Sequence, residues 1–150
     1  MSTVSSVPPI YPPKNIEIYA HRGITAYFPE NTLLSYQESL KLGVNSLDID
    51  VAMTRDNIIV GSHDPFLNKD LTRDSSGKWL DNNNIKIIDL TFTELQKYDV
   101  GRINPASPYS THFPLQKGFD NIPIFPKKNL FNFALIAVIC ILLYCLGVFY

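Results

Sequence analysis

The sequence predicts an α/β domain followed by an apolar helix, and three patterns carry this prediction. Residues 16–20 and 46–53 are rich in branched apolar side chains, as β-strands are. Residues 32–42 lie between them and carry apolar side chains at helical spacing. Residues 129–150 contain no Asp, Glu, Lys, Arg or His, which is typical of an apolar helix. The chain of 150 residues has the length of one domain.

Composition excludes two classes of protein. The formal net charge is −1, so no basic surface suited to nucleic acid is expected. Residues 1–14 are polar and proline-rich, without a basic start or an apolar core, so we expect a flexible arm and not a secretory signal. Cys140 and Cys145 both lie in the apolar run, so they indicate neither a disulfide framework nor a redox compartment.

The first strand, 16–20, ends directly before His21. Gly23 then lets the backbone turn, because glycine adopts positive φ without a steric cost. The helix 32–42 follows, with Leu33 at the start of its apolar face. Two polar residues are suited to cap its start, Asn31 and Thr32.

Residues 46–53 alternate strictly between two faces. Four apolar side chains share one face: Leu47, Ile49, Val51 and Met53. The other face carries Asp48, Asp50 and Ala52. A turn at 54–57 leads into a further strand, 58–62, which ends directly before His63.

Residues 66–118 are polar and rich in Asn, Asp and Ser, so we interpret them as an insertion. Within it, Ile85–Leu90 has the pattern of a short strand. Thr93–Tyr98 has the pattern of a short helix with Glu94 in its first turn. Either of two residues can cap that helix, Thr91 or Thr93.

Two carboxylates and two histidines at strand ends suggest one common site. Asp48 and Asp50 start roughly 6–7 Å apart on one strand face and can converge on a hard cation such as Mg²⁺ or Ca²⁺. His21 and His63 have the chemistry of a general acid and base, and Arg22 offers a fork for phosphate oxygens. This set suits cleavage of a phosphodiester. The alternative is a solvated edge strand with structural histidines.

These residues also carry a family resemblance. The chain contains His21-Arg22-Gly23, Pro29-Glu30-Asn31-Thr32, Asp48-x-Asp50-Val51, Thr54-x-Asp56 and His63-Asp64-Pro65, in that order. As a set, they resemble the opening of the glycerophosphodiester phosphodiesterase family across roughly residues 16–80. Further matches follow at Leu71-Thr72-Arg73, Gly77, Leu90-Thr91, Glu94-Leu95 and Gly101.

The resemblance implies the N-terminal portion of a TIM-type barrel with an inserted subdomain. It implies a divalent metal, Mg²⁺ or Ca²⁺, and hydrolysis of a glycerophosphodiester to an alcohol and glycerol 3-phosphate. By position, His21 and His63 are the expected catalytic pair and Arg22 the substrate-binding residue. Asp48 and Asp50 are the expected metal ligands. Two residues are expected to support the site, Glu30 and Asn31.

The chain departs from the family pattern in two places. Asp48 stands where the family usually has Glu, which shortens the reach to a metal by one methylene. No Asp or Glu follows Asp120, so we expect the third metal carboxylate of the family to be missing. A closed barrel takes about 250 residues. We therefore expect residues 15–125 to form a partial domain, with its insertion at about 66–118.

The apolar run leaves two alternatives open. Residues 130–150 are long enough for a transmembrane helix, and Lys127 and Lys128 before them place the soluble part in the cytoplasm if the helix inserts. Alternatively, the run is the product of a lost reading frame near codon 124, and the chain is then cytoplasmic. We favour the second, since a membrane anchor does not cover the open sheet edges of a partial barrel. An inactive relative and a membrane-anchored phosphate-binding module therefore remain alternatives to an active enzyme.

Overall fold

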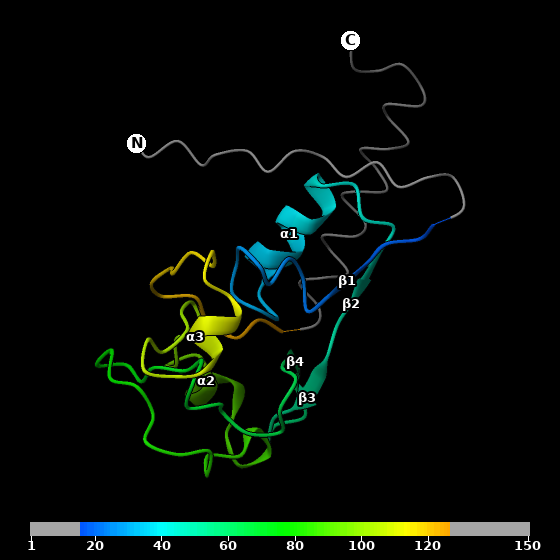
Figure 1. Cartoon of the computed structure of the whole chain (residues 1–150). Coiled ribbons are helices and arrows are strands. Elements are labelled where there is room, and N and C mark those ends of the chain that lie inside the picture. Colours follow the sequence, from blue (N-terminus) through cyan, green and yellow to red (C-terminus); the bar gives the residue numbers. More distant parts are fainter. Residues whose placement is uncertain (1–15, 127–150) are drawn as a thin grey trace.

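A computed structural model describes residues 16–126 (Figure 1). The predicted arm, 1–14, and the predicted apolar helix, 129–150, lie outside this range and stay predictions. No helix within the described range is both long and apolar enough to cross a membrane.

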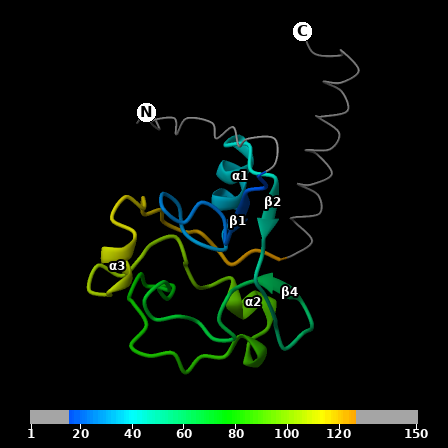
Figure 2. The same cartoon turned by 45° about the vertical axis from the view of Figure 1, so that its right-hand side comes forward.

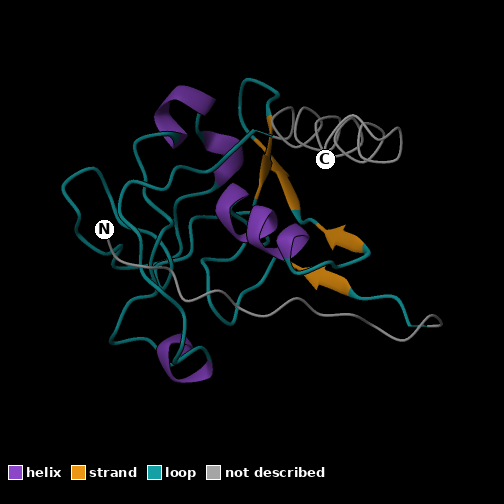
Figure 3. Cartoon of the chain, turned by 90° about the horizontal axis from the view of Figure 1, so that it is seen from above, coloured by secondary structure: helices purple, strands orange, loops and turns teal. Residues whose placement is uncertain are grey.

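The described range contains four short strands and four short helices. They are β1 (Tyr19–His21), α1 (Leu33–Lys41), β2 (Ser46–Asp48), β3 (Val51–Met53), β4 (Ile59–Gly61), η1 (Ile87–Asp89), α2 (Phe92–Leu95) and α3 (Tyr109–His112). Loops connect them over much of the insertion, as Figure 3 shows. The predicted α/β class is therefore confirmed.

The strands form two separate pairs. β1 runs parallel to β2, and His21 lies opposite Asp48 at their carboxyl ends. β3 and β4 form an antiparallel pair in which Ala52 lies opposite Val60. The parallel sheet thus has two strands in residues 16–126, and the antiparallel sheet has two. Figure 1 shows α1 beside the parallel pair.

The prediction of one continuous strand over 46–53 was wrong. The chain pairs with β1 up to Asp48, and from Val51 it pairs with β4 instead. Because the break falls at Ile49 and Asp50, the four apolar residues do not share one buried face. Leu47 and Ile49 pack against Tyr36 and Phe125, whereas Val51 and Met53 remain 49% and 46% exposed.

Helix α1 is capped by Thr32, the second of the two predicted cap residues. The Thr32 hydroxyl accepts a hydrogen bond from the amide of Ser35 at 3.1 Å and donates one to the carbonyl of Pro29 at 2.7 Å. The buried face of α1 consists of Ser35, Tyr36 and Ser39. Small serines on this face allow the helix to approach the turn after β1 closely, while Leu33 and Leu40 are only half-buried.

The insertion holds two departures from the predicted elements. Ile85–Leu90 is not a strand, because the chain turns into η1 and buries Ile87 while Ile88 stays exposed. Helix α2 covers Phe92–Leu95 and ends earlier than the predicted helix Thr93–Tyr98. Its cap is Thr91, whose amide donates to the Glu94 carboxylate at 2.7 Å while the Glu94 amide donates to the Thr91 hydroxyl at 3.2 Å.

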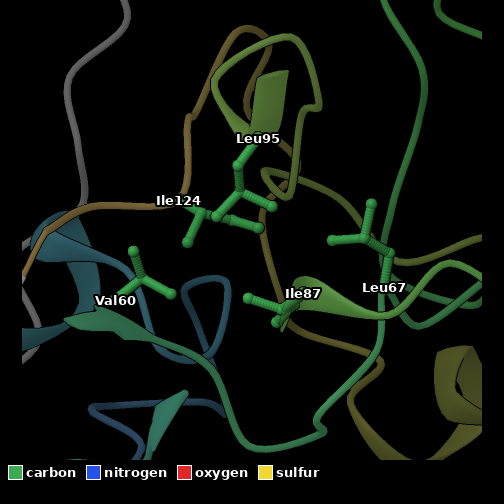
Figure 4. Packing of buried hydrophobic residues seen from close by; sticks show 5 residues of the cluster. All are labelled: Val60, Leu67, Ile87, Leu95 and Ile124. Carbon is green, nitrogen blue, oxygen red and sulfur yellow. The ribbon is translucent and has the colours of Figure 1, made fainter. Parts of the chain in front are cut away.

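The main core joins the insertion to the antiparallel pair of β3 and β4. Five buried residues form it, Val60, Leu67, Ile87, Leu95 and Ile124 (Figure 4). They come from β4, from the start of the insertion, from η1 and α2 within it, and from the segment that follows it. The insertion therefore packs directly on β4 and fixes the segment that follows His63. Figure 2 shows these segments gathered below α1 and β2.

Two polar contacts hold the end of the insertion. Arg73 pairs with both Asp99 and Asp120, and Arg102 makes a two-pronged contact with Asp120 at 2.8 and 2.7 Å. The Gln116 amide donates to the backbone carbonyls of Thr25 and Phe28 at 2.8 and 3.0 Å. The insertion thus also fixes the loop between β1 and α1.

Candidate active site

The carboxyl ends of β1 and β2 form the base of the site. His21 and Asp48 end these neighbouring parallel strands and lie opposite each other in the register. The amide of Arg22 continues the ladder by donating to the carbonyl of Asp48 at 3.0 Å. In α/β folds, ligands bind at this edge of a parallel sheet, because loops and helix starts converge there.

The backbone turns sharply directly after His21. Arg22, Gly23 and Asn31 have φ values of 59°, 90° and 49°, all in the left-handed region. For a residue other than glycine, such a conformation costs on the order of 1–3 kcal/mol and persists only where surrounding contacts impose it. One such contact is the hydrogen bond from the Asn31 amide to the carbonyl of Arg22, at 2.9 Å. The strained turn therefore directs the Arg22 side chain away from the path of β1.

The Arg22 guanidinium lies between two carboxylates. Its Nη1 is 3.2 Å from Glu30 Oε1 and its Nε is 3.3 Å from Asp50 Oδ2, and its side chain is only 16% exposed. Burial lowers the pKa of Arg22, but the two carboxylates outweigh this effect and raise the pKa above its ordinary value. Burial raises the pKa of Glu30, against the opposing pull of Arg22. The site therefore holds a fixed cation with carboxylates on two sides.

Asn31 connects the ion pairs of Arg22 to helix α1. Its side-chain nitrogen lies 3.4 Å from Asp50 Oδ2, and its side-chain oxygen accepts a hydrogen bond from the Tyr36 hydroxyl at 2.8 Å. Asn31 is 6% exposed and Tyr36 is 1% exposed. Burial, followed by the charges of Asp50 and Asp48, raises the pKa of Tyr36 and keeps its hydroxyl protonated.

His63 follows β4 and is held by its neighbour. Its Nδ1 lies 2.9 Å from Asp64 Oδ1, and the other Asp64 oxygen accepts a hydrogen bond from the Asn68 side chain at 2.9 Å. When Nδ1 carries the proton it donates to Asp64, which leaves Nε2 free to exchange a proton with a ligand. A cleft of about 50 Å³ is lined by Glu30, Asn31, His63 and Asp64 together with residues of the insertion.

The structure brings the predicted site residues together in two groups. The first group is a contact network of Arg22, Glu30, Asn31 and Asp50. The second group lines one cleft and consists of Glu30, Asn31 and His63. His21 is exposed beside Asp48 at the strand ends. Among residues 16–126, no hydrogen bond joins His21 to His63.

Two carboxylates are available for a cation, but they are not equivalent. Asp48 is exposed, whereas Asp50 already contacts Arg22 and Asn31. Residues 16–126 contain no group of three or more His, Cys, Asp or Glu side chains arranged to hold a metal ion. One or two carboxylates together with water and substrate phosphate are a usual set for Mg²⁺, so Asp48 and Asp50 fit such an ion in part.

Sequence reasoning missed two residues that contact this network. Tyr36 was not identified as a site residue, and Asp64 was noted beside His63 without a role. Asp64 follows its histidine directly, and an adjacent carboxylate is a signal that could have been used. Tyr36 gave no such signal, because its hydroxyl reaches Asn31 only after the chain has turned through the cap of α1.

Comparisons with known proteins place this sequence in a family. The model of the glycerophosphoryl diester phosphodiesterase family matches residues 21–133. A Bacillus subtilis glycerophosphodiester phosphodiesterase is 34% identical over 97 residues, covering 64% of this chain and 30% of that protein. Human glycerophosphodiester phosphodiesterase 1 is 32% identical over 108 residues, covering 71% and 28%.

A solved structure extends the likeness to the fold. The putative glycerophosphoryl diester phosphodiesterase from Silicibacter pomeroyi is 32% identical, with a TM-score of 0.76 over 78% of this chain and 39% of that one. The chain spans less than a third of the length of the curated relatives named above. The family model nevertheless covers most of this chain. The chain therefore belongs to the glycerophosphoryl diester phosphodiesterase family.

Proposed function

We propose that this chain supplies the phosphate-binding and proton-transfer residues for hydrolysis of a glycerophosphodiester to an alcohol and glycerol 3-phosphate. The observation that carries the proposal is the position of Arg22, which is held between Glu30 and Asp50 directly after the strand that presents His21. A rigid, planar guanidinium at a strand end suits the two anionic, non-bridging oxygens of a phosphodiester, to which it can donate two hydrogen bonds.

The proposed proton transfers use the two histidines. One imidazole takes a proton from the attacking hydroxyl group, which water supplies in the net hydrolysis, and the other donates a proton to the leaving alkoxide. A P–O bond to the attacking oxygen forms as the P–O bond to the alcohol breaks. His63 suits either role, because Asp64 fixes its Nδ1 and leaves Nε2 available. A positioned acid or base contributes roughly 100- to 10,000-fold to a rate, which is the scale of loss expected when either imidazole is removed.

The proposed metal ligands are Asp48 and Asp50. A bound divalent cation, Mg²⁺ or Ca²⁺, would supply neutralising charge for the phosphoryl oxygens. Asp50 would then have to give up part of its contact with Arg22, because the cation and the guanidinium would approach the same carboxylate. The substrate phosphate, which is also an anion, would take the place of Asp50 at Arg22.

The test is hydrolysis of glycerophosphocholine by the full chain with Mg²⁺ or Ca²⁺. We expect turnover that His21→Ala and His63→Ala each abolish and that a chelator removes. A second candidate is a phosphate-binding module without turnover, which the engagement of Asp50 by Arg22 and Asn31 favours. Saturable binding of glycerol 3-phosphate with no release of alcohol at either metal would support that candidate and overturn the proposed hydrolysis.

A further inference from the structure

A buried tyrosine hydroxyl lies directly behind the carboxylate network. Tyr36 sits on α1, and its ring packs edge-on against Phe125 with the ring centres 6.0 Å apart. Leu33, Leu47 and Ile49 complete this apolar surrounding. A hydroxyl in such a place is unfavourable unless it is hydrogen-bonded, so the partner of this group defines what it does.

That partner is Asn31. The Tyr36 hydroxyl donates to Asn31 Oδ1 at 2.8 Å, and a second acceptor, the carbonyl of Asp48, lies 3.4 Å away. A hydroxyl has one proton, so the shorter contact is the hydrogen bond. The second acceptor belongs to Asp48, one proposed metal ligand, and Asn31 contacts the other, Asp50.

The hydrogen bond fixes which way the Asn31 amide faces. With Oδ1 held by Tyr36, the Nδ2 group points toward Asp50 Oδ2, 3.4 Å away. A carboxylate only accepts hydrogen bonds, so the reversed amide would set two oxygens against each other. The Tyr36 hydroxyl therefore acts on Asp50 through a single intermediate side chain.

We propose that Tyr36 is a positioning residue, whose hydroxyl orients Asn31 and through it the Asp50 carboxylate for a divalent cation. This inference rests on the proposed function, since Asp50 is a metal ligand only there. Groups that orient a metal ligand typically change metal affinity or activity by about 10- to 100-fold when removed. A phenylalanine at this position keeps the ring packing and removes only the hydroxyl.

The experiment compares the full chain with its Tyr36→Phe variant. Mn²⁺ binding is followed by electron paramagnetic resonance, and glycerophosphocholine hydrolysis is measured across Mg²⁺ concentrations. We expect about tenfold weaker Mn²⁺ binding, a matching rise in the Mg²⁺ needed for half-maximal rate, and recovery of rate at high Mg²⁺. The side-chain amide resonances of Asn31, assigned with Asn31→Ala, should shift or broaden in the variant.

Two controls separate positioning from general loosening. Tyr98→Phe makes the same chemical change at a half-buried tyrosine packed on the main core, and it should leave Mn²⁺ binding unchanged. In an Asn31→Ala background, Tyr36→Phe should cause no additional loss, because the route to Asp50 is already broken.

The possible results are distinct. Unchanged Asn31 resonances, or altered resonances with unchanged Mn²⁺ binding, would overturn the role of Tyr36 while the parent chain still binds metal and turns over. A parent chain that neither binds Mn²⁺ nor hydrolyses the diester overturns the proposed function, and the role of Tyr36 falls with it.

Discussion

The backbone amide of Asn31 donates a hydrogen bond to the backbone carbonyl of Arg22 at 2.9 Å, and both residues have positive φ. Neither residue is a glycine, so each conformation is unfavourable by itself. The bond joins the turn after β1 to the cap region of α1, and Arg22 is also held by the carbonyl of Asp48 at 3.0 Å. The cation of the site is therefore fixed through its backbone as well as through its side chain.

Gly23→Ala should destabilise the chain more than a typical surface substitution does. Gly23 has a φ of 90°, and an added Cβ would lie 2.7 Å from Ser35 Cβ on α1. Backbone strain and overpacking together should lower the free energy of unfolding by about 2–4 kcal/mol. Urea denaturation of the full chain measures this loss.

Gly77→Ala is the matched control for that prediction. Gly77 has a similar φ of 82°, but an added Cβ would meet nothing within 4 Å. Only the backbone cost remains, about 1–2 kcal/mol. An equal loss of stability in the two variants would show that close packing of α1 on the turn is not the reason why residue 23 must be glycine.

Arg22→Lys should weaken binding of glycerol 3-phosphate even though the positive charge is kept. A lysine amine cannot contact Glu30 and Asp50 from two directions and also present a planar fork to phosphate. The loss of one hydrogen bond between charged groups, about 1.5–3 kcal/mol, corresponds to tenfold or more in affinity. Isothermal titration calorimetry measures the affinity. Arg55→Lys is the control, since Arg55 lies on an exposed turn and contacts Glu94; a comparable loss there would contradict the assignment.

Much of the site was predictable because its motifs are local in sequence. The strand end at His21, the cap at Thr32 and the strand that ends at Asp48 depend on residues within a few positions of one another. Such short patterns determine backbone conformation with little help from tertiary contacts. The contact of Arg22 with Glu30 also follows once the turn between them is closed.

The predictions were wrong where contacts between distant segments determine the local structure. Residues 46–53 alternate like one strand, yet the chain changes partner after Asp48 because β4 competes for pairing from Val51 onward. Ile85–Leu90 looks like a strand, but burial of Ile87 in a core built from β4 and α2 favours a single turn. Neither competing partner is visible in the local pattern.

Asp99→Asn should destabilise the chain most at neutral pH. Burial raises the pKa of Asp99, but hydrogen bonds from the amides of Gly101, Asn121 and Ile122 and the contact with Arg73 lower it overall. A folded pKa below the unfolded one, about 3.9, gives stability that is complete above that value and is lost as the pH falls through the folded pKa. We expect a loss of about 1–3 kcal/mol at neutral pH and a flatter acid dependence.

Urea denaturation between about pH 3 and about pH 7 tests this sign. The control is Asp81→Asn, because Asp81 is 77% exposed and contacts only Lys78. If Asp99→Asn lost the same stability at every pH, the ionised carboxylate would not be the source of the effect.

Gln116→Ala should loosen the loop between β1 and α1. The Gln116 amide donates to the carbonyls of Thr25 and Phe28, and no other side chain in residues 16–126 donates to both. Faster hydrogen exchange is expected at the amides of residues 24–28, with a local loss of about 1–2 kcal/mol. Gln37→Ala on α1 makes the same change away from this loop. Unchanged exchange at 24–28 would contradict a role of the insertion in fixing the site.

Asp64→Asn should lower kcat with little change in KM. Asp64 Oδ1 lies 2.9 Å from His63 Nδ1, and an amide there can present its NH₂ group to the ring and reverse which nitrogen carries the proton. Nε2 would then carry the proton and could not act as a base. We expect a loss of kcat of at least tenfold and at most the roughly 100- to 10,000-fold that a positioned acid or base contributes.

The pH–rate profile distinguishes this effect from a loss of structure. Asp64→Asn should change the pH–rate profile, whereas Asp81→Asn, which removes the same charge at an exposed site, should leave the profile intact. Asn68→Ala removes the hydrogen bond that holds the other Asp64 oxygen at 2.9 Å, so it should cause a smaller change in the same direction. If Asp64→Asn raised KM and left kcat and the pH profile unchanged, His63 would bind substrate without transferring a proton.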